Sequence, residues 1–125
     1  MKRIVCFVFI LLLGLPIYAN AVHDGNKLLS AFGKCRTSYT YEQYQDSVAC
    51  ACAHSYIYGI IAGVDVARGN NWLYHLPEGG IPTTQIVSIV KKYLRNNPAK
   101  LHHRAEELVV LAIKEAFPVN ERKQQ

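Results

Sequence analysis

The feature that most constrains the fold is the stretch from Thr40 to Arg68, which contains no proline. Thr40 and Gln43 have the spacing of a capping box, and Gly69 follows the last residue as a helix-ending glycine. The stretch therefore predicts one long helix. Two rows of residues run along it at helical spacing: a bulky row of Val48, Cys52, Tyr56, Ile60 and Val64, and a small row of Ala51, Ser55, Gly59, Gly63 and Ala67.

The small row indicates how this helix is used. Small residues let another helix approach closely, so we predict the central helix of a bundle. The run from Val48 to Val64 carries no formal charge, and a membrane span is the alternative. The run is short for a span, and two tyrosines, a histidine and a serine lie inside it. A buried bundle helix is therefore the preferred interpretation.

Three shorter helices are predicted around the long one. Asp24 or Asn26 can cap the first, and Gly33 ends it. A second begins at Thr83 or Thr84. A last one begins at Asn97-Pro98 and stops at Pro118. No segment clearly predicts a strand. The predicted fold class is all-α, a small bundle of about four helices with a long central helix.

The first 21 residues have the pattern of a cleavable secretory signal peptide. Lys2 and Arg3 give a basic start, Val5 to Leu15 is an apolar run, and Ala19-Asn20-Ala21 is an A-x-A cleavage site. The apolar run is too short and wrongly flanked for a transmembrane anchor. We expect cleavage after Ala21, a periplasmic location and no membrane contact afterwards. Residues 22–125 then form a single helical domain.

Cleavage changes what the composition means. Removing 21 of the 125 residues leaves 104, and losing Lys2 and Arg3 lowers the formal net charge from +5 to +3. A chain of this size has room for one modest core. The remaining basic residues are scattered and not grouped, so nucleic acid is not predicted as a partner.

Export also places Cys35, Cys50 and Cys52 in a compartment where disulfides form and persist. Cys50 and Cys52 leave opposite sides of a helix, so a bridge from Cys35 to one of them is expected. The third thiol is then free or bonded to another chain. Closing such a 15- to 17-residue loop stabilises by about 3 kcal/mol.

The inventory of chemical motifs is poor. Cys50, Cys52 and His54 form C-x-C-x-H, which departs from the C-x-x-C-H of haem attachment, and on a helix they point in different directions. His102-His103 lacks a partner at i, i+4. Glu106 and Glu107 are interpreted as surface charge and not as a catalytic pair. We predict no metal, no cofactor and no catalytic residue, so a binding protein is favoured over an enzyme.

A loop is predicted from Asn70 to Thr83, and it is the candidate partner-binding segment. Aromatic residues are common at binding hot spots, because they give a large contact area with little loss of rotamer freedom. An equally weighted alternative is that Trp72 and Leu73 simply cover one end of the bundle. The candidate partner-binding residues are Trp72, Leu73, Tyr74, His75 and Glu78.

A run of short motifs carries a family resemblance. Its C-terminal part is the specific one, and Gly25 to Leu29 and Ser55 to Gly59 add a weaker match upstream. The run resembles the Rap/Tai family, which are exported immunity proteins for type VI secretion amidase effectors. His75 and Val119 stand where that family usually has cysteines. The motifs are Leu76-Pro77-Glu78-Gly79, Gln85-Ile86-Val87, Lys92-Tyr93-Leu94, Asn97-Pro98, Leu101-His102 and Ala116-Phe117-Pro118.

The resemblance implies an all-helical, dimeric periplasmic protein. Its partner would be a cognate peptidoglycan amidase effector, which it would bind and occlude without chemistry of its own. A general periplasmic helper, such as an acid-stress holdase or a small assembly factor, is the alternative function.

Overall fold

The computed structural model describes residues 22–69 and 73–119, and the regular secondary structure of this part is helical, apart from one isolated bridge between Asp24 and Arg104. The all-α prediction with a long central helix is therefore confirmed. The predicted signal peptide, residues 1–21, lies outside the described residues. The elements are α2 (Gly25–Gly33), the 3-10 helix η1 (Tyr41–Gln43), α3 (Tyr44–Arg68), α4 (Thr83–Asn96), the 3-10 helix η2 (Pro98–Lys100) and α5 (Ala105–Ala116).

Local signals set most helix ends. The Asp24 carboxylate accepts a hydrogen bond from the Lys27 amide at 2.9 Å and caps α2. The Gln43 side chain accepts one from the Thr40 amide at 3.3 Å, as the capping box predicts, and η1 leads directly into α3. After α3, Gly69 takes a positive φ of 53°, a conformation that glycine adopts without strain.

The start of the last helix differs from the prediction. Pro98 opens only the short η2, and α5 begins at Ala105. The carbonyls between them bind α2 instead of continuing a helix: Leu101 accepts from the Asn26 amide at 3.1 Å, and His103 accepts from the Gly25 amide at 3.2 Å. This tertiary contact interrupts the helix that the local sequence favours.

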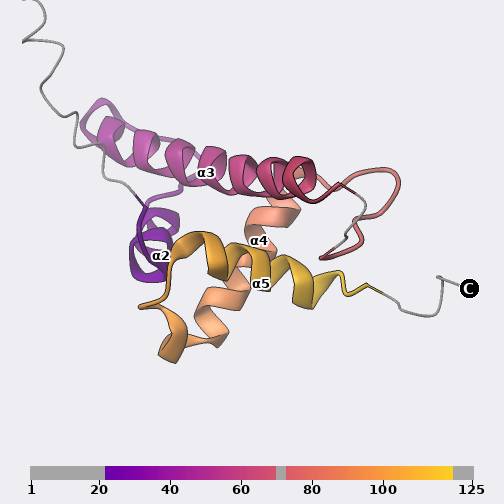
Figure 1. Cartoon of the computed structure of the whole chain (residues 1–125). Coiled ribbons are helices and arrows are strands. Elements are labelled where there is room, and N and C mark those ends of the chain that lie inside the picture. The colour runs from indigo at the N-terminus through magenta and orange to yellow at the C-terminus, as the bar shows by residue number, and fades with distance from the viewer. Residues whose placement is uncertain (1–21, 70–72, 120–125) are drawn as a thin grey trace, which may run out of the picture.

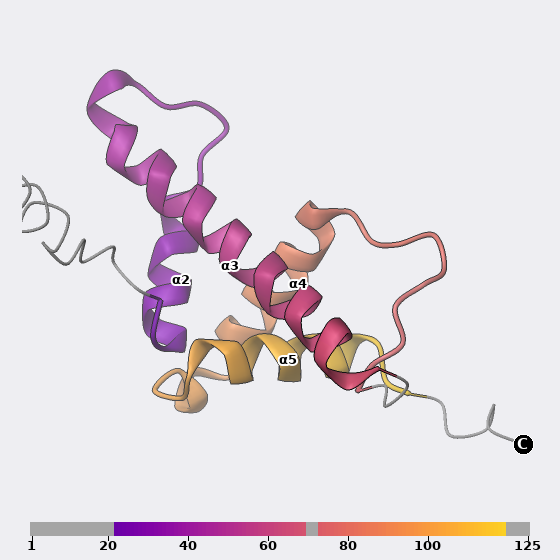
Figure 2. The same ribbon diagram turned by 45° about the horizontal axis from the view of Figure 1, so that its top comes forward.

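The helices α2, α4 and α5 all pack on one side of α3 (Figures 1 and 2). The α3 residues that enter the core are Ala53, Ile57 and Ile61. From the other helices, the largest fully buried side chains are Phe32 and Leu28 of α2, Val90 and Leu94 of α4, and Leu108, Val109 and Ile113 of α5.

The prediction of a buried central helix therefore holds for one face only. Tyr56, Ile60 and Val64 of the bulky row pack partly against the core, but Val48 and Cys52 are exposed. All five residues of the small row are exposed, so the prediction that they meet another helix of the bundle is wrong. The reason is that α3 lies at the edge of the bundle, with every partner helix on one side. By length and composition alone, Tyr41–Arg68 could also cross a membrane.

Candidate binding surfaces

The loop between α3 and α4 is fixed at its start by Tyr74. This side chain is only 3% exposed, and its hydroxyl donates a hydrogen bond to Asp65 Oδ1 at 3.0 Å. Burial, and then the hydrogen bond to the Asp65 carboxylate, raise the pKa of Tyr74 well above its usual value, so the phenol stays protonated. Tyr74 therefore ties the loop to α3 from inside the molecule.

Backbone contacts fix the rest of the loop. The His75 amide donates to the Phe117 carbonyl at 3.0 Å, which links the loop to the end of α5. A turn follows, in which the Gly80 amide donates to the Pro77 carbonyl at 2.8 Å and Gly80 takes a φ of 73°. After the contacts of Tyr74 and His75, the loop stands out from the bundle (Figure 2). We call residues 75–80 the anchored loop.

The predicted partner-binding residues divide between two environments. His75 and Glu78 are exposed, and Leu73 is half-buried and packs against the core. Tyr74 is an internal anchor, so its ring is not available at the surface. Trp72 lies outside the described residues. The exposed part of the anchored loop is therefore His75, Pro77, Glu78 and the two glycines.

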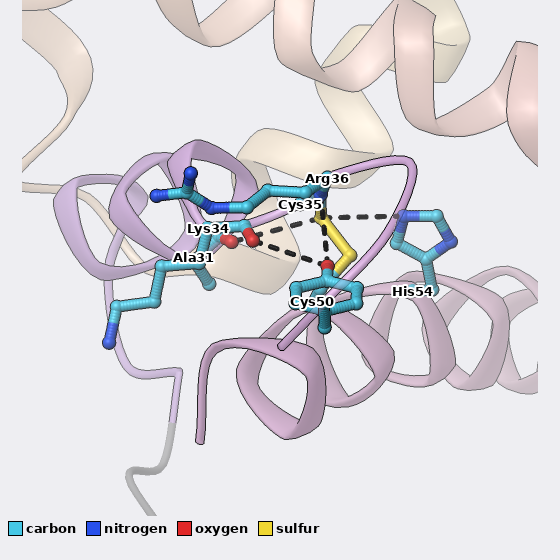
Figure 3. The surroundings of a disulfide bond; sticks show 7 residues. Ala31, Lys34, Cys35, Arg36, Cys50 and His54 are labelled. Carbon is cyan, nitrogen blue, oxygen red and sulfur yellow. Dashed lines mark hydrogen bonds between the residues drawn. A yellow bond between two sulfur atoms is a disulfide. The ribbon is translucent and has the colours of Figure 1, made fainter. Parts of the chain in front are cut away.

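A disulfide joins the end of α2 to the start of α3. It links Cys35 to Cys50, with their Cα atoms 5.0 Å apart, and Cys52 is a free, exposed cysteine. The expected bridge thus uses Cys50 and not Cys52. Figure 3 shows the His54 ring beside this disulfide, with Nε2 at 3.8 Å from Cys35 Sγ. Sequence reasoning missed this neighbour, although Cys50 and His54 have the i, i+4 spacing that places two residues on one helix face.

A polar contact connects α3 to α5. The Tyr56 hydroxyl donates to Glu106 Oε2 at 3.1 Å, and Glu106 also pairs with Arg104. Burial, with the hydrogen bond to Glu106, raises the pKa of Tyr56 to about 12. A hydrogen bond from its own backbone amide, together with those from Tyr56 and Arg104, holds the pKa of Glu106 below its usual value. Glu106 therefore joins two helices, whereas the neighbouring Glu107 is exposed surface charge.

The exposed residues of α3 from Tyr44 to Gly63 carry no formal charge, and the first charged one, Asp65, follows them. On the outward side of the helix, Val66 is 85% exposed and Tyr58 is 51% exposed. The nearest acidic groups are already paired, Asp46 with Lys34 at 3.6 Å and Asp65 with Tyr74. A continuous uncharged band of this kind is typical of an interaction surface. We call it the outer face of α3, and it consists of Tyr44, Val48, Ala51, Cys52, Ser55, Tyr58, Gly59, Ala62, Gly63 and Val66.

The described residues thus form a small helical domain with an anchored loop and an exposed, largely uncharged helix face. The family model described as Rap1a immunity proteins matches residues 24–119. The chain belongs to this family, which confirms the resemblance drawn from its motifs, and membership implies a role as an immunity protein. A comparison with curated proteins finds no match.

Proposed function

We propose that this chain is an exported immunity protein that binds a peptidoglycan amidase effector of type VI secretion and occludes its cleft. Family membership over residues 24–119 supports the immunity role. The signal pattern of residues 1–21 and the Cys35–Cys50 disulfide support export to the periplasm, with cleavage after Ala21. The chain itself supplies contact area and no chemistry.

The anchored loop is the observation that carries this proposal. Its N-terminal end is held by the Tyr74–Asp65 hydrogen bond and by the backbone bond from His75 to Phe117, and Ile81, directly after the loop, packs against the core. A loop that is ordered before binding loses little conformational freedom on entering a cleft, so more of its contact energy becomes affinity. The exposed side chains of His75, Pro77 and Glu78 would meet the amidase.

The test is rescue of cells that produce the cognate amidase in the periplasm. The wild-type chain should restore growth and bind the amidase tightly. Glu78→Lys should raise the Kd at least about tenfold, which corresponds to about 1.4 kcal/mol, because it reverses a charge at the contact. Glu115→Lys makes the same change on the exposed surface of α5 and should leave rescue intact.

Two results would contradict the proposal at different levels. Full toxicity in the presence of the wild-type chain, for every amidase encoded nearby, would remove the immunity role. Wild-type affinity in Glu78→Lys would keep the role but place the contact away from the anchored loop.

We further propose that the working unit is a homodimer joined through the outer face of α3. In a twofold antiparallel pair of helices, residues equally far before and after the axis face each other. With the axis level with Ile57, Val48 meets Val66, and Ser55 meets Gly59. The valines thus lie at the two ends and the small Ser55 and Gly59 at the centre, where the helices approach most closely, with Tyr58 beside them. This symmetry of size, together with the absence of charge, favours a second copy as the occupant.

The same register provides a crosslinking test. It places Ala62 of one copy opposite Cys52 of the other, so Ala62→Cys should form an intermolecular disulfide with the native Cys52. Non-reducing electrophoresis should show a covalent dimer. The double variant Cys52→Ser/Ala62→Cys keeps the new thiol without its partner and should stay uncrosslinked. A wild-type chain that is monomeric by light scattering at all concentrations would contradict the dimer.

A further inference from the structure

Three groups that can ligate a metal meet at the junction of α2 and α3. The Sγ atoms of Cys35 and Cys50 and a ring nitrogen of His54 all lie within 4.8 Å of one another, and all three residues are half-buried. Figure 3 shows the imidazole facing the disulfide from the next turn of α3. Neither the proposed occlusion of an amidase nor the proposed dimer uses His54.

Contacts other than the disulfide also hold these groups in place. Cys50 and His54 lie one turn apart on a long helix. On the α2 side, the Cys35 amide donates to the Phe32 carbonyl at 3.2 Å, and Phe32 is a core residue only 1% exposed. The Phe32 ring meets the His54 ring edge to face, with centroids 6.5 Å apart.

The chain that follows Cys35 is also held. The Tyr39 hydroxyl donates to the Lys34 carbonyl at 3.2 Å and accepts from the Arg36 amide at 2.9 Å, so it bridges the two residues on either side of Cys35. Opening the S–S bond therefore leaves both thiols and the imidazole near one another.

Two thiolates and one imidazole form a ligand set that Zn²⁺ prefers. We propose that Cys35, Cys50 and His54 bind one Zn²⁺ ion when the disulfide has been opened by a dithiol reductant. The dithiol gives two electrons and two protons to the S–S bond and itself becomes a disulfide. Zn²⁺ then displaces the two thiol protons, and water fills the fourth position of this half-buried site.

The zinc site and the disulfide therefore exclude each other, because they use the same two sulfur atoms. In the oxidised chain the two sulfur atoms are bonded to each other, and no thiolate is available to a metal. In a tetrahedral zinc centre the two sulfur atoms lie about 3.8 Å apart. Rotation of the two cysteine side chains can supply this separation, because their Cα atoms are 5.0 Å apart. Either the S–S bond or the metal can thus join α2 to α3.

The test uses the chain purified from the periplasm, reduced with a dithiol and freed of it without oxygen. Co²⁺ serves as the spectroscopic probe, since thiolate ligation gives an intense charge-transfer band. We expect one Co²⁺ per chain, displacement of Co²⁺ by Zn²⁺, and no binding by the unreduced chain. Far-UV circular dichroism should show that the reduced chain keeps its helices.

Variants distinguish Co²⁺ binding at this site from non-specific binding of Co²⁺ to thiols. His54→Ala should raise the Kd for Co²⁺ by more than the about 10- to 100-fold that losing an outer-shell partner costs, because it removes a direct ligand. Cys52→Ser removes the exposed free thiol, which points away from the cluster, and should leave the Kd unchanged. Equal affinity in wild type and His54→Ala, loss of binding in Cys52→Ser, or loss of helix on reduction would each overturn the proposal.

Discussion

At the scale of single residues, Gly25 is the one glycine of the described residues at which an added Cβ atom would meet neighbouring atoms within 4 Å. A Cβ atom there would lie 2.5 Å from Leu108 Cδ1 and 3.0 Å from the Leu101 carbonyl oxygen. The leucine side chain can move, but the Leu101 backbone is held by its hydrogen bond from Asn26. The absence of a side chain at Gly25 therefore lets α2 contact the segment between η2 and α5.

We predict that Gly25→Ala lowers the free energy of unfolding by about 1–3 kcal/mol, because the added methyl group overpacks this contact. Gly33→Ala is the matched control in the same helix, since a Cβ at Gly33 meets nothing within 4 Å. That variant should be neutral or more stable by up to about 1 kcal/mol. Urea unfolding measures both, and equal losses in the two variants would contradict the packing argument.

Tyr56 makes the stability of the folded chain depend on pH in the alkaline range. Its pKa is raised from 10.0 to about 12 in the folded chain, first by burial and then by its bond to Glu106. A raised pKa means that the protonated phenol stabilises the fold fully below pH 10, and that this contribution is lost as the pH rises towards 12.

We therefore predict that the free energy of unfolding falls between pH 10 and about 12, and that Tyr56→Phe reduces this slope. Tyr74 contributes a slope of its own, because its pKa is raised as well. Tyr41→Phe, at a side chain that is 98% exposed and outside the outer face of α3, is the control and should keep the wild-type slope. Urea unfolding at several pH values measures the slopes. Identical slopes in all three proteins would show that Tyr56 does not contribute to the pH dependence of stability.

For the candidate partner-binding residues, residue type alone does not tell whether a side chain lies at the surface or in the interior. The sequence places an aromatic cluster in a loop, and aromatic residues serve equally well as interface anchors or as internal ones. Tyr74 is internal because Asp65, nine residues earlier on α3, accepts its hydroxyl hydrogen bond. That pairing depends on where the chain returns after Gly69, which no local pattern specifies. Glu78 and His75 were predictable as surface residues from their polarity alone.

At the scale of elements, helix ends were largely predictable and helix faces were not. Asp24, the Thr40–Gln43 pair and Gly69 act on their own neighbours, so their effect can be deduced from the sequence. Which side of α3 enters the core depends on where α2, α4 and α5 pack. The buried row, Ala53, Ile57 and Ile61, is neither of the two rows predicted, and it contains an alanine where a large residue would be expected.

The disulfide is the covalent link between two of these elements. It closes a 15-residue separation between Cys35 and Cys50. We predict that the double variant Cys35→Ala/Cys50→Ala loses about 3 kcal/mol of unfolding free energy, because the unfolded chain regains the freedom of an open loop. Cys52→Ala changes an exposed residue and should lose little. Urea unfolding under non-reducing conditions measures both, and equal stability of the double variant and wild type would contradict the loop-closure argument.

At the scale of the whole molecule, the two faces of α3 differ. The helices α2, α4 and α5 bury one face of α3, and the outer face remains uncharged and open (Figure 1). The anchored loop lies between α3 and α4, adjacent to the end of α5. Two copies joined through α3 would therefore each keep an anchored loop for a separate amidase, so one dimer would neutralise two effector molecules.

Export, cleavage and thiol state can be tested together on the intact protein. We expect the periplasmic chain to start at Val22, with a mass two hydrogens below that of the reduced 104-residue sequence, because Cys35 and Cys50 are joined. Alkylation of the unfolded chain without reduction should add one group, at the free Cys52. Alkylation after reduction and unfolding should add three, one at each cysteine of the cleaved chain. Intact mass spectrometry distinguishes these species. A mass that still includes residues 1–21 would contradict cleavage, and three groups added without reduction would show that the disulfide does not form in the cell.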